Sequence, residues 1–175
     1  MTNNAPDATA AGTSAPNTAA TRALAESGIG YTVTANGQVN SLEEAAVARG
    51  LAPSQILKTL VVRKGDDDFL LVLVPGDRQI SWPKLRELLG VSRLSMPDKD
   101  VARAATGYER GTITPFGSLG SSAGTPWPVI ADALIVSRPG PVSIGAGAHG
   151  VAATVDPADL VATLDAHVAA VTEPL

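Results

Sequence analysis

Residues 56–75 of this 175-residue chain read ILKTLVVRKGDDDFLLVLVP, and this stretch decides the fold. Its two apolar runs, Ile56–Arg63 and Phe69–Pro75, have strand length and flank the polar linker KGDDD. Aliphatic runs separated by such a linker predict two antiparallel strands joined as a hairpin. We therefore expect a sheet at the centre of the protein.

Helix signals surround the hairpin. Ser41, followed three residues later by Glu44, is typical of a helix start, and Gly50 is typical of the end of that helix. Further helices are expected over Thr21–Ser27, Ser81–Gly90 and Pro97–Ala105, and a last one from Asp156-Pro157 that places Leu160, Leu164 and Val168 on one face. Further strands are expected over Tyr31–Ala35, Val129–Val136, Pro141–Ile144 and Val151–Val155. This order predicts an α/β (α+β) fold with a mixed, largely antiparallel sheet surrounded by short helices.

Length and composition predict one domain. Residues 1–20 are rich in Ala, Thr, Asn and Pro without apolar periodicity, so we expect a disordered tail, followed by a single domain over residues 21–175. The hydrophobic fraction is 45% but the aromatic fraction is only 3%, so the core must be aliphatic. The sequence shows neither a run long enough to span a membrane nor a signal peptide, which predicts a cytoplasmic protein.

The chain has no cysteine, which excludes disulfides, cysteine nucleophiles and thiolate zinc sites. Only His149 and His167 could ligate a metal as histidines, and the carboxylates show no clustered spacing. We therefore expect neither a metal nor a cofactor.

Charge is distributed unevenly along the chain. Residues 58–110 hold ten Lys and Arg against eight Asp and Glu, whereas residues 111–175 hold one Arg and five acids. With a net charge of −4, a large phosphate-tracking groove is not expected, but a contact with the end of a nucleic acid is compatible with the basic middle.

Lys58 is the only charged residue in Ile56–Val62. Strand alternation places it on one face with Ile56, Leu60 and Val62, where a lysine is costly unless its ammonium reaches water or a partner. Two interpretations stay open from this feature alone. The lysine either extends outward at the strand end, or points into a cleft to hold a phosphate or a carbonyl oxygen.

The segment Thr106–Gly117 reads TGYERGTITPFG and carries three glycines and one proline. Glycines let the backbone approach a ligand closely, and such a loop can point several N–H groups at one oxyanion. The alternative is an ordinary turn-rich connection. The loop and the following Ser118–Pro128 together exceed the usual length of a connection, which favours a function.

Other candidates carry weaker signals. Ser143, Gly145 and Gly147 end a predicted strand in small residues, which fits either a cleft floor or close backbone packing. His149 could border a site, and Asp132 could be a site residue or an acid at a strand end. The sequence has several serines but no G-x-S-x-G nucleophile motif.

Taken in order, these motifs resemble the YbaK/ProX-type aminoacyl-tRNA deacylases, which are related to the insertion domain of bacterial prolyl-tRNA synthetase. The resemblance runs from about Leu42 to Leu160. It rests on ILKTL at 56–60, LVPGD at 73–77, TGY at 106–108, GTITPFG at 111–117, PVIAD at 128–132 and SIGAG at 143–147. The segment Ser118–Pro128 is elaborated relative to the family.

The resemblance implies a stand-alone domain that hydrolyses the ester between an amino acid and the terminal ribose of a mischarged tRNA. It implies a partner in the tRNA acceptor 3′ end, and a second potential partner in an aminoacyl-tRNA synthetase. The most fitting substrates are Ala- or Cys-tRNA(Pro). The expected catalytic residues are Lys58, Gly111, Thr112, Ile113, Thr114 and Pro115, and the expected substrate-binding residues are Gly107, Tyr108, Phe116, Gly117, Asp132, Ser143, Gly145, Gly147 and His149.

In this scheme, N–H groups of Gly111–Pro115 stabilise the oxyanion, although Pro115 itself has no N–H to donate. Lys58 anchors a phosphate or braces the loop, and the attacking group is either water or a group of the substrate. A non-catalytic module that binds tRNA or a synthetase on the same fold is the alternative. A phosphate-ligand enzyme built on Gly145–Gly150 is a third, weaker hypothesis.

Overall fold

The computed structural model describes residues 16–37 and 39–175, so the disorder expected over residues 1–15 lies outside the described residues. The helices are α1 (Ala19–Ser27), α2 (Leu42–Arg49), the 3₁₀ turn η1 (Pro53–Gln55), α3 (Trp82–Leu89), α4 (Lys99–Thr106), α5 (Leu134–Ser137) and α6 (Pro157–Thr163). The strands are β1 (Tyr31–Ala35), β2 (Leu57–Gly65), β3 (Asp68–Pro75), β4 (Arg78–Ile80), β5 (Val129–Asp132), β6 (Val142–Gly145), β7 (Val151–Val155), β8 (His167–Ala169) and β9 (Thr172–Pro174).

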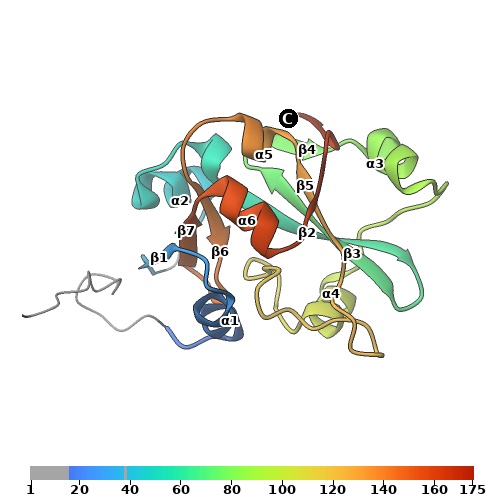
Figure 1. Ribbon diagram of the computed structural model, residues 1–175, viewed down its shortest axis with the longest axis horizontal. Helices are drawn as coiled ribbons and strands as arrows, with labels where there is room; N and C mark the ends of the chain where they lie inside the picture. Colours follow the sequence, from blue (N-terminus) through green and yellow to red (C-terminus); the bar gives the residue numbers. More distant parts are fainter. Residues whose placement is uncertain (1–15, 38) are drawn as a thin grey trace, which may run out of the picture.

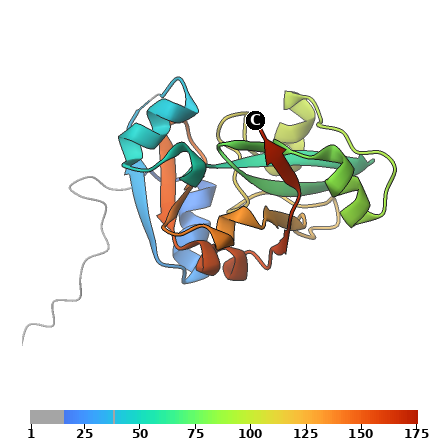
Figure 2. The ribbon, with the colours of Figure 1, turned by 90° about the horizontal axis from the view of Figure 1, so that it is seen from above.

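The strands form two sheets and a ribbon (Figure 1). One sheet has the order β2-β3-β5-β8, with β2 and β3 antiparallel and the other neighbours parallel. The second sheet, β1-β7-β6, and the ribbon β4-β9 are antiparallel. The sheets lie side by side (Figure 2) and meet at a parallel bridge between Ile56 and Ser143. The predicted class, a mixed and largely antiparallel sheet structure with short helices, is confirmed.

The β2–β3 hairpin is the predicted one. It pairs Leu57 with Pro75 at one end and Arg63 with Phe69 at the other. Alternation along β2 sends Leu57 and Val61 into the larger core, and Val62 into a second core that also holds Leu85 of α3. Because both cores cover β3, its residues 70–74 are at most 2% exposed. Burial on both faces explains why that run is apolar throughout instead of alternating.

The predicted ends of α2 and α3 at Gly50 and Gly90, and the predicted cap at Ser41, are confirmed. The Ser41 hydroxyl accepts a hydrogen bond from the Glu44 N–H at 3.0 Å, and Gly50 and Gly90 end α2 and α3 in the left-handed conformation. Helix α4 begins at Lys99, not at Pro97, because the Asp98 carboxylate caps it by accepting two backbone N–H groups. In the described part of the chain, no helix is both long and apolar enough to cross a membrane.

Two predictions near the C-terminus are wrong in part. The strand expected over Val129–Val136 ends at Asp132, because the Asp132 carboxylate accepts the Leu134 N–H and starts the short helix α5. The last helix ends at Thr163, before Leu164 and Val168 could extend its apolar face. The chain then turns at Asp165 (φ 50°) and pairs in parallel with β5 as β8.

The first helix begins earlier than predicted. The expected tail included residues up to 20, but α1 starts at Ala19 and Ala20 is fully buried. Thr18 caps the helix, and its hydroxyl donates to the carbonyl of Ala146, 128 residues further along the chain, at 2.7 Å. The start of α1 is thus fixed by a long-range contact that local sequence does not show.

Candidate active site

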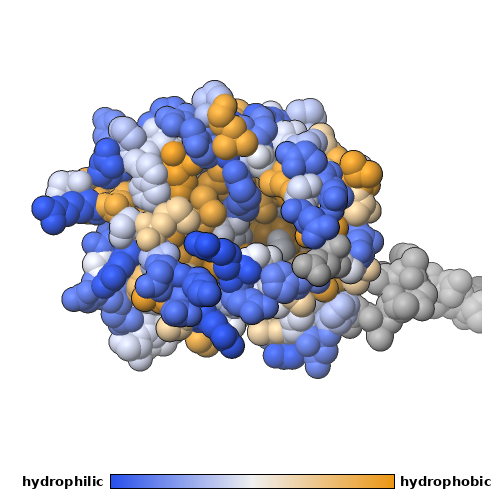
Figure 3. Space-filling model, turned by 180° about the vertical axis from the view of Figure 1, so that it is seen from behind, coloured by the Kyte–Doolittle hydropathy of each residue, from blue (hydrophilic) through white to orange (hydrophobic). Residues whose placement is uncertain are grey.

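A cavity of about 460 Å³ lies beside the outer edge of β2. Helix α2, the segment Met96–Lys99, Ala102 of α4, the loop residues Arg110, Gly111 and Ile113, and Gly145 of β6 surround it. Its apolar lining includes Leu42, Ala45 and Val61. The face of the molecule seen in Figure 3 has a hollow with hydrophobic residues inside and hydrophilic residues across its rim.

The backbone of β2 faces this cavity. Arg63 exchanges both of its backbone hydrogen bonds with Ser95, on the side away from β3. In an antiparallel strand, alternate residues point their N–H and C=O groups to the same side. Thr59 and Val61 therefore also point these groups away from β3, and both line the cavity. The cavity wall thus offers main-chain donors and acceptors beside apolar side chains.

The charge of the lining has one sign. Arg49, Lys58, Lys99 and Arg110 line the cavity, and no Asp or Glu of the described residues does. Burial lowers the pKa of Arg49, but an arginine stays charged at any physiological pH. Although the chain carries a net charge of −4, this cavity suits an anionic ligand.

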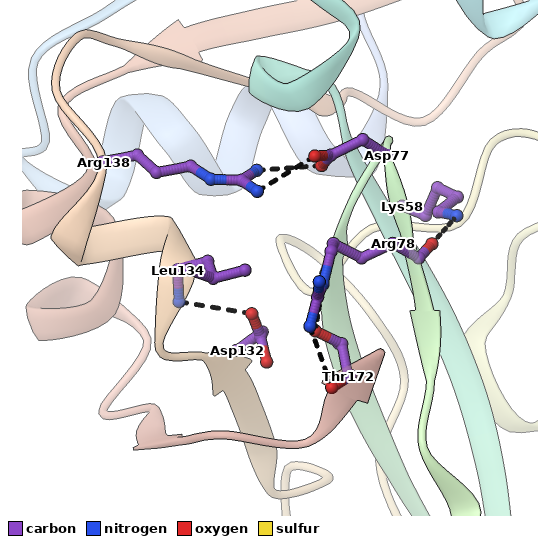
Figure 4. Close-up of polar contacts among 7 residues, drawn as sticks. All are labelled: Lys58, Asp77, Arg78, Asp132, Leu134, Arg138 and Thr172. Atoms are coloured by element: carbon purple, nitrogen blue, oxygen red, sulfur yellow. Dashed lines mark hydrogen bonds and ion pairs between the residues drawn. The ribbon is translucent and has the colours of Figure 1, made fainter. Parts of the chain in front are cut away.

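Lys58 is half-buried at the border of the cavity. Its ammonium donates to the Arg78 carbonyl at 2.5 Å (Figure 4), so the lysine braces the start of β4 and not the glycine loop. Burial lowers the pKa of Lys58, and the negative charge of Asp77 opposes that shift. An ammonium has three donors, so two stay available beyond the bond to Arg78.

A bidentate ion pair stands behind Lys58. Arg138 donates to both carboxylate oxygens of Asp77 at 2.8 and 2.9 Å (Figure 4). This pairing holds the pKa of Asp77 below its ordinary value. The carboxylate thus stays ionised near Lys58 and favours its charged form.

Much of the predicted glycine loop forms its own scaffold. The buried Tyr108 hydroxyl donates to the Phe116 carbonyl at 2.7 Å and ties the two ends of the loop together. Burial raises the pKa of Tyr108 to about 12, so this hydroxyl keeps its proton. Thr112, Thr114 and Phe116 are buried as well. These side chains hold the shape of the loop and do not line the cavity.

The part of the loop that reaches the cavity is short. Arg110, Gly111 and Ile113 line it. The Thr112 N–H is taken by the Glu109 carbonyl at 3.0 Å, whereas the N–H groups of Gly111 and Ile113 have no acceptor among the described residues. Two donors of the predicted set are therefore free in the described structure. Pro115 lies outside the cavity lining.

Gly111 has a conformation that suits glycine. Its φ is 91°, and a Cβ there would lie 3.2 Å from Cε1 of His149. His149 in turn contacts Glu109 at 2.9 Å, and both side chains are more than half exposed. The structure thus places His149 directly behind the loop and outside the cavity lining.

The segment SIGAG at 143–147 contributes one residue to the cavity. Gly145 lines it, and a Cβ there would lie 3.4 Å from the Ile113 carbonyl oxygen. Ser143 is fully buried, and its hydroxyl accepts from Arg49 at 3.0 Å. Gly147 packs against Thr18 and Tyr108, where a Cβ would come within 3.0 Å of both.

Asp132 and Gly117 lie outside the cavity lining. Asp132 is 2% exposed, and its carboxylate accepts the N–H groups of Val171 at 3.1 Å and Leu134 at 3.2 Å. Gly107 ends α4 in the left-handed conformation, and Gly117 packs against Ala19 with no room for a Cβ. The contacts of Asp132, Gly107 and Gly117 therefore support the fold.

Sequence reasoning missed Arg49, Met96, Lys99 and Arg110 as lining residues. Arg49 lies in the last turn of helix α2, where a cation is ordinary because it complements the helix dipole. Met96 lies in a stretch without strand or helix periodicity. Their common location comes from the tertiary fold, and no local signal marks it.

Together, the fold and the cavity define a small domain that suits an anionic ligand carrying an apolar group. The chain belongs to the aminoacyl-tRNA editing domain family, whose model matches residues 36–163. This confirms the resemblance drawn from the ordered motifs.

Similar proteins of known sequence are proline–tRNA ligases. This chain is 35% identical to the ligase of Heliobacterium modesticaldum over 77 residues. These residues make up 44% of this chain and 13% of the ligase. The ligase of Thermosipho africanus is 34% identical over 80 residues, or 46% of this chain and 14% of the ligase. The chain therefore spans only a small part of the length of these relatives.

Solved structures share the fold over most of the chain. A candidate trans-editing enzyme for prolyl tRNA synthetase has a TM-score of 0.79 at 28% identity, over 91% of this chain and 99% of its own. The hypothetical protein APE2540 has a TM-score of 0.79 at 24% identity, over 89% of this chain and 100% of its own, and shows the fold alone.

Proposed function

We propose that this protein hydrolyses the ester of a mischarged tRNA, with Ala- or Cys-tRNA(Pro) as the substrate. The observation that carries the proposal is the cavity itself. It joins four cations, with no Asp or Glu of the described residues in the lining, to apolar side chains and the residues Gly111 and Ile113, whose N–H groups have no acceptor among the described residues. A tRNA 3′ end presents matching chemistry: an anionic backbone, a carbonyl that becomes an oxyanion, and a small side chain. The sequence similarity to proline–tRNA ligases supports tRNA(Pro) as the carrier.

Different residues of the cavity would have different roles in the reaction. Leu42 and Ala45 would contact the amino-acid side chain. The N–H groups of Gly111 and Ile113 would stabilise the negative charge that develops on the carbonyl oxygen, an effect worth about 100-fold or more for one donor. Lys58 would use its remaining donors to hold a phosphate, which makes it an electrostatic anchor.

The reaction needs no covalent nucleophile from the protein. A water molecule, or a hydroxyl of the substrate, attacks the ester carbon. The bond from that carbon to the ribose oxygen breaks, and the ribose oxygen leaves with a proton as a hydroxyl. If a substrate hydroxyl attacks first, water then completes the hydrolysis.

The test is a deacylation assay with Ala-tRNA(Pro) and Cys-tRNA(Pro), followed by a screen of other mischarged tRNAs. Lys58→Ala should abolish release of the amino acid. Lys84→Ala is the matched control, because Lys84 also donates to a backbone carbonyl, that of Thr172 at 3.1 Å, but does not line the cavity. No release from any mischarged tRNA would contradict the proposal.

One observation favours the alternative of a non-catalytic module that binds tRNA or a synthetase. The ammonium of Lys58 is engaged by the Arg78 carbonyl, which gives the lysine a structural partner. Under this alternative, titration shows binding of tRNA or synthetase, while hydrolysis is the same with Lys58 and with Lys58→Ala.

A further inference from the structure

A second hollow, also of about 460 Å³, lies at the other end of β2. Arg63, Lys64, Arg86 and Arg93 line it together with Ser92 and Ser95. These residues come from the end of β2, from α3 and from the connection that follows α3. We call this hollow the basic groove.

The fold holds this groove in shape. Arg63 and Ser95 exchange backbone hydrogen bonds at 2.8 and 3.1 Å, which fixes the connection after α3 against the end of β2. Gly90 ends α3 in the left-handed conformation and turns the chain toward this contact. The cations on the connection and on the strand are therefore brought together by backbone pairing.

The charge of the groove is largely uncompensated. Among the described residues, no Asp or Glu lines it, and the one ion pair is that of Arg63 with the fully exposed Asp66 at 2.7 Å. Arg86 is half-buried and has no hydrogen-bond acceptor among the described residues. Four neighbouring cations repel one another unless an anion lies between them. Arginine forks in a wide groove suit the phosphates of a nucleic-acid backbone.

Strand β2 connects the two hollows. The first cavity includes β2 as far as Val61 and the groove begins at Arg63, two residues or roughly 7 Å further at about 3.4 Å per residue. A stacked nucleic-acid strand advances about 3.4 Å per nucleotide, so the two neighbouring hollows can contact consecutive nucleotides of one strand. With the terminal ester in the first cavity, the groove meets the phosphates that lead from the 3′ end towards the stem.

We propose that the basic groove binds phosphates of the tRNA acceptor stem and so holds the 3′ end in the cavity. This inference rests on the proposed function, and it adds a contact outside the reacting centre. The groove residues would act as binding residues that lower KM. Residues of the cavity would govern kcat.

The test compares two substrates. Arg86→Gln, Arg93→Gln and the double variant are assayed on full-length aminoacyl-tRNA and on an aminoacylated 3′-terminal trinucleotide that lacks the stem. The double variant should lose about tenfold or more in kcat/KM on full-length tRNA, with the salt slope of log(kcat/KM) falling by about 0.7–0.9 per phosphate contact removed. Its kcat/KM on the trinucleotide should stay unchanged. Arg22→Gln, on α1, is the single-charge control.

Binding of uncharged tRNA(Pro), measured by fluorescence anisotropy at several salt concentrations, separates the two proposals. If the wild-type protein hydrolyses nothing, the proposed function fails, but weaker binding by the double variant still supports the groove. Unchanged binding by the double variant overturns the proposal that the basic groove binds tRNA. Equal losses of kcat/KM on both substrates also overturn it, because the effect then lies in the cavity or in the fold.

Discussion

The cavity beside β2 and the cluster around Asp132 were predicted as one site, and the structure makes them two different regions. In the cavity, Lys58 and Gly111 line open space with cations and unpaired backbone donors. Around Asp132, both carboxylate oxygens are bonded to backbone N–H groups and the side chain is 2% exposed.

A binding region and a structural region differ in how many hydrogen-bonding groups stay free. An aspartate after an apolar strand and a lysine within one look equally anomalous in a sequence. The number of hydrogen-bonding groups left free after folding separates them. Lys58 has one donor on the Arg78 carbonyl (Figure 4), and its side chain lines the cavity. Changes in the cavity should therefore alter kinetics, and changes around Asp132 should alter stability.

After Lys58→Ala, the largest effect is expected for Gly111→Val. The residue has φ 91°, so valine is strained there by about 1–3 kcal/mol, and the loop must move its N–H groups. Activity should fall about 100-fold, in line with the loss of an oxyanion donor. Gly28→Val is the matched control, because Gly28 has φ 80° and open space around it at the end of α1. Both variants should lose similar stability in thermal melts. If Gly111→Val retained its kcat, the loop would not be part of the cavity's chemistry.

Asp132→Ala should show the opposite behaviour. Removing the carboxylate leaves the N–H groups of Leu134 and Val171 without their acceptor, at a cost of about 2–4 kcal/mol in the free energy of unfolding. Chemical denaturation measures this loss. At a temperature well below the melting transition, kcat and KM should stay within about twofold of the wild type, because Asp132 does not line the cavity. A large fall in kcat with unchanged stability would show that Asp132 takes part in the functional site.

The Asp77–Arg138 pair gives a smaller, pH-dependent effect. Arg138 holds the pKa of Asp77 below its ordinary value, so the pair stabilises the folded state above the ordinary Asp range, and this contribution disappears as the pH falls through the lowered pKa. Both side chains are at least one third exposed, which limits the contribution to about 1 kcal/mol or less. Arg138→Gln should therefore be slightly less stable at neutral pH, and the difference should vanish in strong acid. A difference that grew on acidification would contradict this sign.

The smallest effect is expected for His149→Ala. The contact of His149 with Glu109 is exposed on both sides, and such pairs contribute about 0–1 kcal/mol. The imidazole also packs behind Gly111, so KM should rise by less than about fivefold, which corresponds to 1 kcal/mol. Steady-state kinetics of the variant measure this change. A hundredfold loss of kcat would show that His149 acts on the substrate.

The sequence predicted those parts of the fold that depend on local rules. The hairpin, the cap at Ser41 and the turn at Gly50 follow from neighbouring residues. The apolar spacing of Leu160, Leu164 and Val168 predicts that the last helix continues into β8, but parallel pairing with β5 makes residues 167–169 a strand. The pairing of β4 with β9 joins segments more than 90 residues apart in the sequence, so no local pattern predicts it.

Only some of the candidate site residues lie together in the structure. Lys58, Gly111, Ile113 and Gly145 do line one cavity. Tyr108, Thr114 and Phe116 belong to the same loop but are buried in its scaffold, and a glycine-rich segment does not reveal which of its residues face outward. Arg49 and Met96 reach the cavity from segments that carry no chemical motif.

The contact of Thr18 has a practical consequence for anyone who builds variants of this protein. Its hydroxyl reaches the Ala146 carbonyl, and its neighbour Ala19 packs on Gly117, so the first turn of α1 fastens both glycine segments. A purification tag or fluorescent label joined upstream of residue 16 leaves this fastening intact. A truncation that starts at residue 20 removes it, and would loosen the loop that carries Gly111 without touching any residue of the cavity.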